Sequence, residues 1–70
     1  MSPIRLRVKD YRERQGLTQV ELAEKAGVRR ATVSDYERGR LRIDLAVLEK
    51  LANALGVDAA LLIEHRKGKR

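Results

Sequence analysis

The 70-residue sequence lacks several residue types and patterns, and each absence excludes a class of protein. There is no cysteine, so disulfides and thiolate metal sites are excluded. No apolar run approaches the about 18 residues of a membrane-spanning helix, and no signal-peptide pattern is present. Aromatic residues are limited to two tyrosines, while apolar residues make up 43% of the chain, enough for one small core. We therefore expect a single soluble, cytoplasmic domain.

Groups that support catalysis or cofactor binding are also missing. The single histidine, His65, lies in a basic C-terminal segment that we expect to be disordered, where no general base could be held in place. The sequence has no glycine-rich phosphate loop and no cluster of histidine and acidic residues at metal-ligand spacing. We predict that the chain is not an enzyme and that it uses no cofactor or metal; no small-molecule effector pocket is evident.

Charge is distributed unevenly along the chain, whose formal net charge is +6. Residues 1–43 carry 11 basic and 6 acidic residues, whereas residues 44–64 carry one lysine and four acidic residues. Residues 65–70 add four basic residues. This distribution predicts one cationic face, which is the electrostatic footprint of a polyanionic partner.

The clearest functional pattern spans residues 18–39, where two short helical segments are joined by a tight turn. Thr18 and Glu21 have the spacing of a capping box, and Gly27 is the residue type that most easily ends a helix in the left-handed conformation. Arg29 and Arg30 begin the second segment. The apolar positions expected to face inward are Val20, Leu22, Ala23, Ala26, Val28, Val33 and Tyr36. The combination indicates a helix-turn-helix rather than an ordinary helical hairpin.

The segment before this pattern is ambiguous. Residues 4–8 alternate apolar and basic side chains, as a strand does, and residues 8–15 have a helical pattern. The first helix therefore either begins near Ile4 or follows a short strand, and we favour a helix that begins between Leu6 and Val8. A strand there would need a partner, for which residues 61–63 are the only candidate.

After the helix-turn-helix pattern, the sequence predicts two further helices. Asp44 is expected to cap an amphipathic helix that ends at Gly56, with Leu45, Leu48, Leu51, Ala52 and Leu55 as its apolar positions. Asp58 is expected to cap a last short helix that runs to about Glu64. The predicted organisation is one domain over residues 1–64 and a basic tail over residues 65–70.

The pattern L-T-Q-x-E-L-A-x-x-A-G-V, followed by T-V-S-x-Y-E-R-G and by a helix ending in A-L-G-V, resembles the phage Cro/repressor (XRE-like) family of helix-turn-helix DNA-binding domains. The resemblance covers nearly the whole chain. It implies a compact all-α, five-helix, lambda-repressor-like domain whose second and third helices bind DNA. It also implies a transcriptional regulator, expected to be a repressor or autoregulator, that binds double-stranded DNA as a homodimer at a near-palindromic operator.

The resemblance also implies roles for individual residues. The positions that match base-reading residues in the major groove are Arg30, Ala31, Ser34 and Asp35. The positions expected at phosphates are Thr18, Gln19, Arg29, Arg38, Arg40 and Arg42. Arg12 and Glu37 match a buried ion pair that ties the first helix to the end of the third. Arg29 stands where the family commonly has a serine or threonine cap, so a side-chain cap is not expected there.

Three residues of the second helical segment have alternative interpretations. Arg30 can donate two parallel hydrogen bonds to guanine, or it can contact a phosphate. Asp35 could accept a hydrogen bond from cytosine, but we favour an ion pair with Arg38, three residues further along the helix. Tyr36 is expected to pack in the core, although its hydroxyl could reach a phosphate.

The alternative function is a protein-interaction adaptor, or an antitoxin-type partner, that uses the same fold without reading DNA. Such a protein would tolerate the loss of Arg29 and Arg30, whereas a DNA reader needs both side chains free. Binding to a membrane surface is disfavoured, because the amphipathic helix over residues 45–55 carries only Lys50 as a basic residue. Apolar surface at Leu45, Val47, Ile63 and residues 4–8 is the candidate dimer interface.

Overall fold

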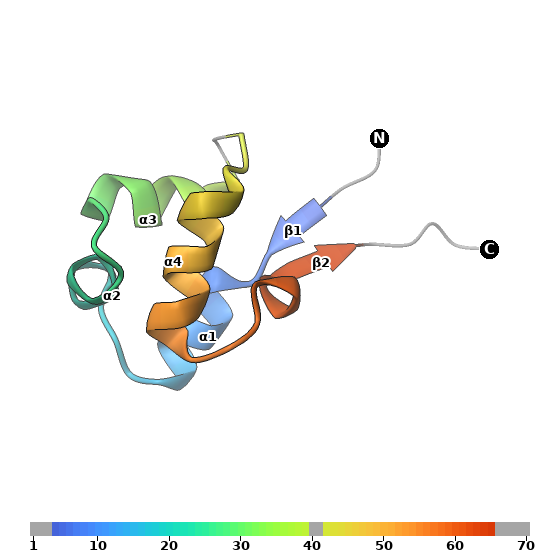
Figure 1. The fold of residues 1–70 in the computed structure, drawn as a ribbon. Coiled ribbons are helices and arrows are strands. Elements are labelled where there is room, and N and C mark those ends of the chain that lie inside the picture. Colours follow the sequence, from blue (N-terminus) through green and yellow to red (C-terminus); the bar gives the residue numbers. More distant parts are fainter. Residues whose placement is uncertain (1–3, 40–41, 66–70) are drawn as a thin grey trace.

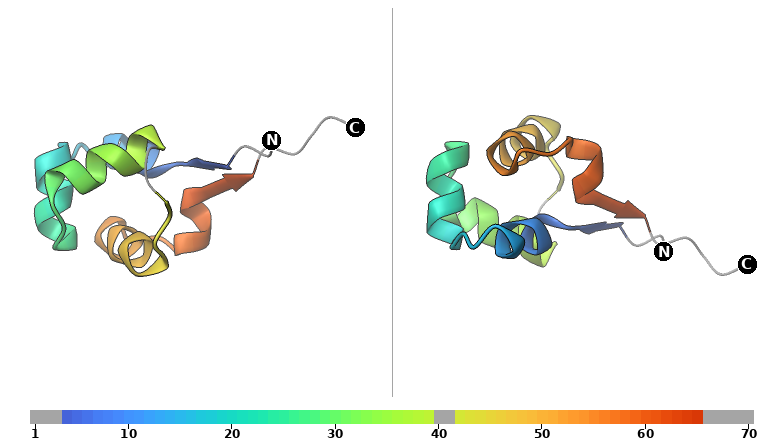
Figure 2. Two further views of the ribbon diagram at one scale, coloured as in Figure 1. Left: turned by 90° about the horizontal axis from the view of Figure 1, so that it is seen from above. Right: turned by 90° about the horizontal axis from the view of Figure 1, so that it is seen from below.

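The computed structural model describes residues 4–39 and 42–65, which form four α-helices, one 3-10 helix and a two-stranded sheet (Figure 1). The elements in chain order are β1 (Ile4–Leu6), α1 (Val8–Arg14), α2 (Gln19–Ala26), α3 (Arg30–Arg38), α4 (Leu45–Leu55), η1 (Ala59–Leu62) and β2 (Ile63–His65). The helices form the body of the molecule, and the β1–β2 ribbon extends from one end of it (Figure 2). Within the described ranges, no helix has the length and apolar character needed to cross a membrane.

Local hydrogen bonds determine where α2 and α4 begin and end. The hydroxyl of Thr18 accepts from the backbone N–H of Glu21 at 3.0 Å, and the Glu21 carboxylate accepts from the N–H of Thr18 at 2.9 Å. The predicted capping box is therefore present. Gly27 ends α2 with a φ of 74°, in the left-handed region that favours glycine. Asp44 caps α4 by accepting from the N–H of Ala46 at 2.8 Å.

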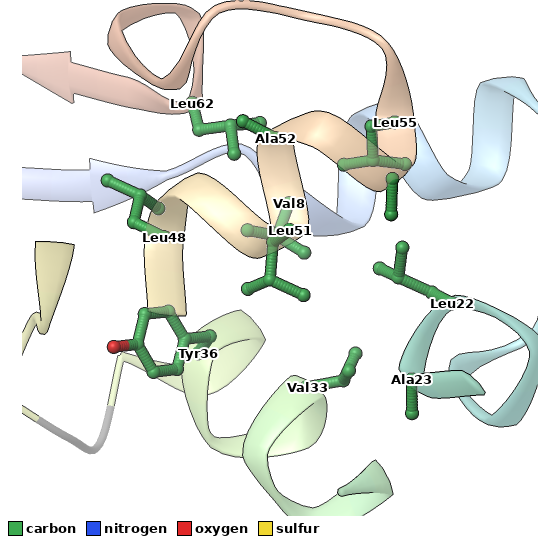
Figure 3. Packing of buried hydrophobic residues seen from close by; sticks show 11 residues of the cluster. Val8, Leu22, Ala23, Val33, Tyr36, Leu48, Leu51, Ala52, Leu55 and Leu62 are labelled. Atoms are coloured by element: carbon green, nitrogen blue, oxygen red, sulfur yellow. The ribbon is translucent and has the colours of Figure 1, made fainter. Parts of the chain in front are cut away.

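The hydrophobic core lies between the four helices and is closed at one end by η1 (Figure 3). α4 runs through the middle and contributes five of the buried residues. The core consists of Val8, Leu22, Ala23, Val33, Tyr36, Leu48, Leu51, Ala52, Ala54, Leu55 and Leu62. Because this core includes residues from every helix, each helix has a fixed position relative to α4.

Two apolar residues predicted to face the core are instead exposed. Val20 in the first turn of α2 is 48% exposed, and Leu45 at the start of α4 is 65% exposed. Side chains in a helix tilt toward its N-terminus, so those of a first turn project beyond the helix rather than across it. Periodicity alone does not show this end effect.

At the N-terminus, the structure contains the strand that the sequence left as an alternative. β1 pairs with β2 in antiparallel orientation, with Ile4 opposite His65 and Leu6 opposite Ile63. α1 then begins at Val8, whose side chain is fully buried. The strand partner is thus displaced toward the C-terminus from the candidate at residues 61–63.

The last helix differs from the prediction. The segment expected to be helical from Asp58 to about Glu64 is a 3-10 helix of four residues, followed at once by β2. Asp58 makes no side-chain cap, and pairing with β1 gives the backbone after Leu62 hydrogen-bond partners that a longer helix would have supplied internally. His65, which was expected in the tail, therefore belongs to β2, and residues 66–70 lie outside the described residues.

A nearly buried ion pair between Arg12 and Glu37 joins α1 to α3. Arg12 Nε lies 2.6 Å from Glu37 Oε2, and Arg12 Nη2 donates to Glu37 Oε1 at 3.2 Å. Arg12 Nη1 donates to the carbonyl of Leu17, between α1 and α2, at 2.8 Å. The side chains are only 10% and 5% exposed. The hydrogen bond with Glu37 raises the pKa of Arg12 above its ordinary value, although burial acts in the opposite direction.

Replacing Arg12 with methionine is expected to lower the free energy of unfolding by about 3–5 kcal/mol, because Glu37 would stay buried without its partner. Urea denaturation measures this change. The double variant Arg12→Met/Glu37→Leu should recover most of the loss, since it leaves no unpaired charge.

The matched control is Lys9→Met, which removes an exposed cation from the same helix. We expect it to change the free energy of unfolding by less than about 0.5 kcal/mol. If the Arg12 and Lys9 variants had equal effects, the ion pair would not be a structural link.

Candidate nucleic-acid interface

The inner face of α3 is fixed to the body of the protein. Val33 is fully buried and Tyr36 is 3% exposed. The hydroxyl of Tyr36 accepts from the backbone N–H of Asp44 at 2.8 Å and donates to the Asp44 carbonyl at 3.3 Å. Tyr36 is thus a core residue. Its hydroxyl, which was considered as a possible phosphate contact, is hydrogen-bonded to the backbone of Asp44 instead. The opposite side of α3 lies along the outside of the molecule (Figure 2).

The four residues predicted to read bases all lie on α3, which begins at Arg30. Arg30 and Ala31 are exposed, and Ser34 and Asp35 are half-buried. The ion pair predicted between Asp35 and Arg38 is not formed among the described residues. A pair of this kind gains little in water and restricts two side chains. The carboxylate of Asp35 therefore stays available to a hydrogen-bond donor.

Three arginines are placed at or beyond the ends of α3. Arg29 immediately precedes the helix and makes no side-chain cap, as expected for arginine at this position. Arg29, Arg38 and Arg42 are exposed and form no ion pair with any residue of the described ranges. Their guanidinium groups can therefore neutralise phosphates. Arg40 was also predicted to contact a phosphate, but it lies outside the described residues.

The N-terminus of α2 offers a second place for an anion. Gln19 is the first residue of the helix, and the partial positive charge of a helix N-terminus favours phosphate there. The Thr18 hydroxyl accepts from Glu21 within the capping box, which leaves its own hydrogen free to be donated. Gln19 Nε2 donates to Glu37 Oε1, and its second N–H remains, so both side chains keep a donor that could serve the predicted phosphate contact.

A chain of side-chain hydrogen bonds connects the start of α3 to the buried ion pair. Arg30 Nη1 donates to Gln19 Oε1 at 3.2 Å, and Gln19 Nε2 donates to Glu37 Oε1 at 3.0 Å. Glu37 is in turn bound by Arg12. Sequence reasoning assigned Gln19 to a phosphate and missed both contacts, because partners 11 and 18 positions away leave no periodic signal.

Comparison with known proteins identifies the fold and its relatives. Residues 8–62, from the start of α1 to the end of η1, match the helix-turn-helix (HTH_3) family model. The chain is 42% identical over 57 residues to the immunity repressor protein of Bacillus phage phi105. The aligned region covers 81% of this chain and 40% of the repressor. It is 36% identical over 61 residues to the transcriptional regulator SinR of Bacillus subtilis, covering 86% of this chain and 55% of SinR.

Solved structures of the same kind superpose closely. The restriction-modification controller protein C.AhdI from Aeromonas hydrophila has a TM-score of 0.76 and 36% identity, over 80% of this chain and 81% of that one. SinR in complex with DNA has a TM-score of 0.75 and 38% identity, over 80% of this chain and 90% of that one. A complex of SinR with the SinI protein gives the same TM-score and identity, over 80% of this chain and 55% of that one.

These matches agree with the geometry of α2 and α3. Two helices joined by a tight turn, the second with a buried inner face and a polar outer face, form the DNA-binding unit of helix-turn-helix proteins. The family model covers more than three quarters of the chain. The chain therefore belongs to the helix-turn-helix family of transcriptional regulators.

Proposed function

We propose that this protein regulates transcription by reading double-stranded DNA through the outer face of α3, which lies in the major groove. The observation that carries the proposal is the position of Arg30. Its side chain is exposed at the N-terminal end of a helix whose other side is anchored by Val33 and Tyr36. The major groove is wide enough for one helix, and the N-terminal residues of a recognition helix contact the base edges.

Each groove-facing residue has a chemical role in the proposal. Arg30 donates two hydrogen bonds to O6 and N7 of guanine, and Ala31 contacts a thymine methyl group. Asp35 accepts from the amino group of cytosine, and Ser34 completes the contact surface. The phosphate contacts come from Thr18, Gln19, Arg29, Arg38, Arg40 and Arg42. These contacts position the helix but carry no sequence information.

The proposed outcome of binding is repression. The phage phi105 relative is named as an immunity repressor, and a SinR structure contains DNA. A protein bound in the major groove of an operator can block access to a promoter without a cofactor or a catalytic step. We place this activity in the cytoplasm, at the nucleoid. A protein partner could control it, as the SinR–SinI complex illustrates for that regulator.

We further propose a homodimer on a near-palindromic operator. Apolar surface suited to an interface is present at Ile43, Leu45 and Leu61, which are 40%, 65% and 51% exposed. Val47 and Ile63 are half-buried next to the core. Within residues 4–8, Val8 is fully buried and Leu6 packs partly buried against the core, so this segment offers less apolar surface than the sequence suggested. A two-fold dimer presents two copies of α3 to two symmetric half-sites.

In vitro selection from randomised duplex DNA is expected to enrich a near-palindrome with a guanine at one symmetric position. Arg30→Ala should relax the preference at that position only, by about 1–3 kcal/mol of discrimination. Lys50→Ala is the matched control, because it removes an exposed cation from α4.

The control variant should select the same sequence as the wild type. If the wild type enriched no sequence, the proposal of a specific reader would be wrong, and the adaptor function would be favoured instead. If Lys50→Ala changed the selected sequence as Arg30→Ala does, α3 would not be the reading element.

The arginines at and beyond the end of α3 give a second prediction. The double variant Arg38→Gln/Arg42→Gln should bind all DNA sequences more weakly by the same factor, because phosphate contacts do not depend on sequence. The slope of log K against log salt should fall in magnitude by about 1 for each lost contact. Fluorescence titrations at several salt concentrations measure both quantities. An unchanged slope would place both arginines away from the phosphates.

Sedimentation equilibrium at micromolar concentrations tests the dimer. We expect a reversible dimer that is weakened by Leu45→Lys, because this change puts a charge into the proposed apolar interface. Lys50→Leu, which removes a charge from the same helix, is the control and should not weaken the dimer. A wild type that stayed monomeric both with and without operator DNA would rule the dimer out.

A further inference from the structure

We propose that Glu37 is a positioning residue for base reading, acting through Gln19 to hold the guanidinium of Arg30 in place for guanine. The inference deepens the proposed function and rests on it. The basis is the continuous set of hydrogen bonds from Arg12 to Glu37, from Glu37 to Gln19 and from Gln19 to Arg30. This set connects the interior of the protein to its groove-reading surface.

The first link fixes the carboxylate. Glu37 has a side chain that is only 5% exposed, and Arg12 binds both of its oxygens, at 2.6 and 3.2 Å. A carboxylate held by two parallel hydrogen bonds from a guanidinium has one allowed orientation. Glu37 Oε1 therefore presents a stationary negative acceptor toward the start of α2.

The second link fixes the amide of Gln19. An ionised carboxylate can only accept hydrogen bonds, so Gln19 must turn its NH2 group toward Glu37, and this bond measures 3.0 Å. The carbonyl oxygen of the same amide then necessarily points the other way. Glu37 thus determines that Gln19 presents an acceptor, rather than a donor, to Arg30.

The third link holds the reading side chain. Arg30 Nη1 donates to Gln19 Oε1 at 3.2 Å. A guanidinium has five N–H donors, so four remain after this bond, and guanine needs only two of them. Because a long side chain is already partly ordered, less conformational entropy is lost when it binds. The reversed amide would place donor against donor and push Arg30 away.

The test is the variant Gln19→Met, which keeps the length of the side chain and removes both hydrogen bonds. The measured quantity is the ratio of affinities for the selected operator and for an operator with the Arg30-dependent guanine replaced. We expect this ratio to fall about threefold to tenfold, the equivalent of ordering one long side chain. Val20→Met, on the same helix and 48% exposed, is the control and should keep the full ratio.

A double-mutant cycle separates positioning from the phosphate contact that Gln19 is also proposed to make. Loss of a phosphate contact weakens both operators equally and leaves the ratio unchanged. In an Arg30→Ala background, Gln19→Met should therefore lose its effect on the ratio while still lowering overall affinity. An effect on the ratio that persisted without Arg30 would contradict the proposal.

Glu37→Gln tests the buried end of the chain. The new amide can turn its own NH2 toward Gln19, and the Gln19 amide must then reverse. We expect the same fall in the affinity ratio as for Gln19→Met, measured on protein shown by circular dichroism to be folded. If Glu37→Gln does not fold, Gln19→Met decides the matter, because it breaks the same link between Glu37 and Arg30 at a half-buried residue outside the hydrophobic core.

The outcomes for the two proposals are distinct. If the wild type selects no operator, or if Arg30→Ala leaves every base preference intact, the proposed function is wrong and this inference falls with it. If the wild type and Arg30→Ala behave as proposed but Gln19→Met keeps the full affinity ratio, only the positioning role is overturned.

Discussion

The ion pair between Arg12 and Glu37 is the constraint on which the arrangement of α1, α2 and α3 depends. Two charges are almost completely removed from water, which is costly unless their hydrogen-bonding groups find partners. Here the guanidinium binds both carboxylate oxygens and the carbonyl of Leu17, and the carboxylate also accepts from Gln19. These bonds are satisfied together only when the three helices have their observed positions, so the pair specifies the geometry more than it adds stability.

This specification matters because the hydrophobic core is small. A chain of 70 residues buries only about 60% of the surface that its unfolded form exposes, so apolar packing leaves little excess stability. α3 is attached to the core by two large side chains, Val33 and Tyr36. The hydroxyl of Tyr36 adds hydrogen bonds to the backbone of Asp44 at the start of α4. Together with the Glu37 ion pair, these contacts hold α3 by its inner side and leave its other side free for a partner.

Features governed by neighbours in the sequence were predictable. The capping box at Thr18 depends on a residue three positions away, and the ends of α2 and α4 at Gly27 and Gly56 depend on one residue each. Four buried positions of α4 also follow from helical periodicity, but buried Ala54 was not predicted, and Leu45 in the first turn is exposed. The helix-turn-helix could therefore be derived from the sequence, together with the exposure of Arg30.

Features governed by distant partners were only partly predictable. The family resemblance implied the Arg12–Glu37 pair, and a strand at the N-terminus was left as an alternative, but their partners could not be derived from sequence neighbours. Pairing of Ile63–His65 with Ile4–Leu6 joins the two ends of the chain, and it ends the predicted last helix early. The orientation of the Gln19 amide depends on Glu37, which lies on another helix. The absence of a bond between Asp35, which is half-buried, and exposed Arg38 depends on the competition of water with a partly exposed ion pair. In each case the sequence supplies the right residue types, but only the fold determines which partner each one meets.

Methylation interference on the selected operator tests the central claim, that α3 reads DNA from the major groove. Dimethyl sulfate methylates N7 of guanine in the major groove and N3 of adenine in the minor groove. We expect methylation of the Arg30-dependent guanine to abolish binding and adenine methylation within the half-site to have little effect. Binding that tolerated N7 methylation at that guanine, but was lost on adenine methylation, would contradict the claim.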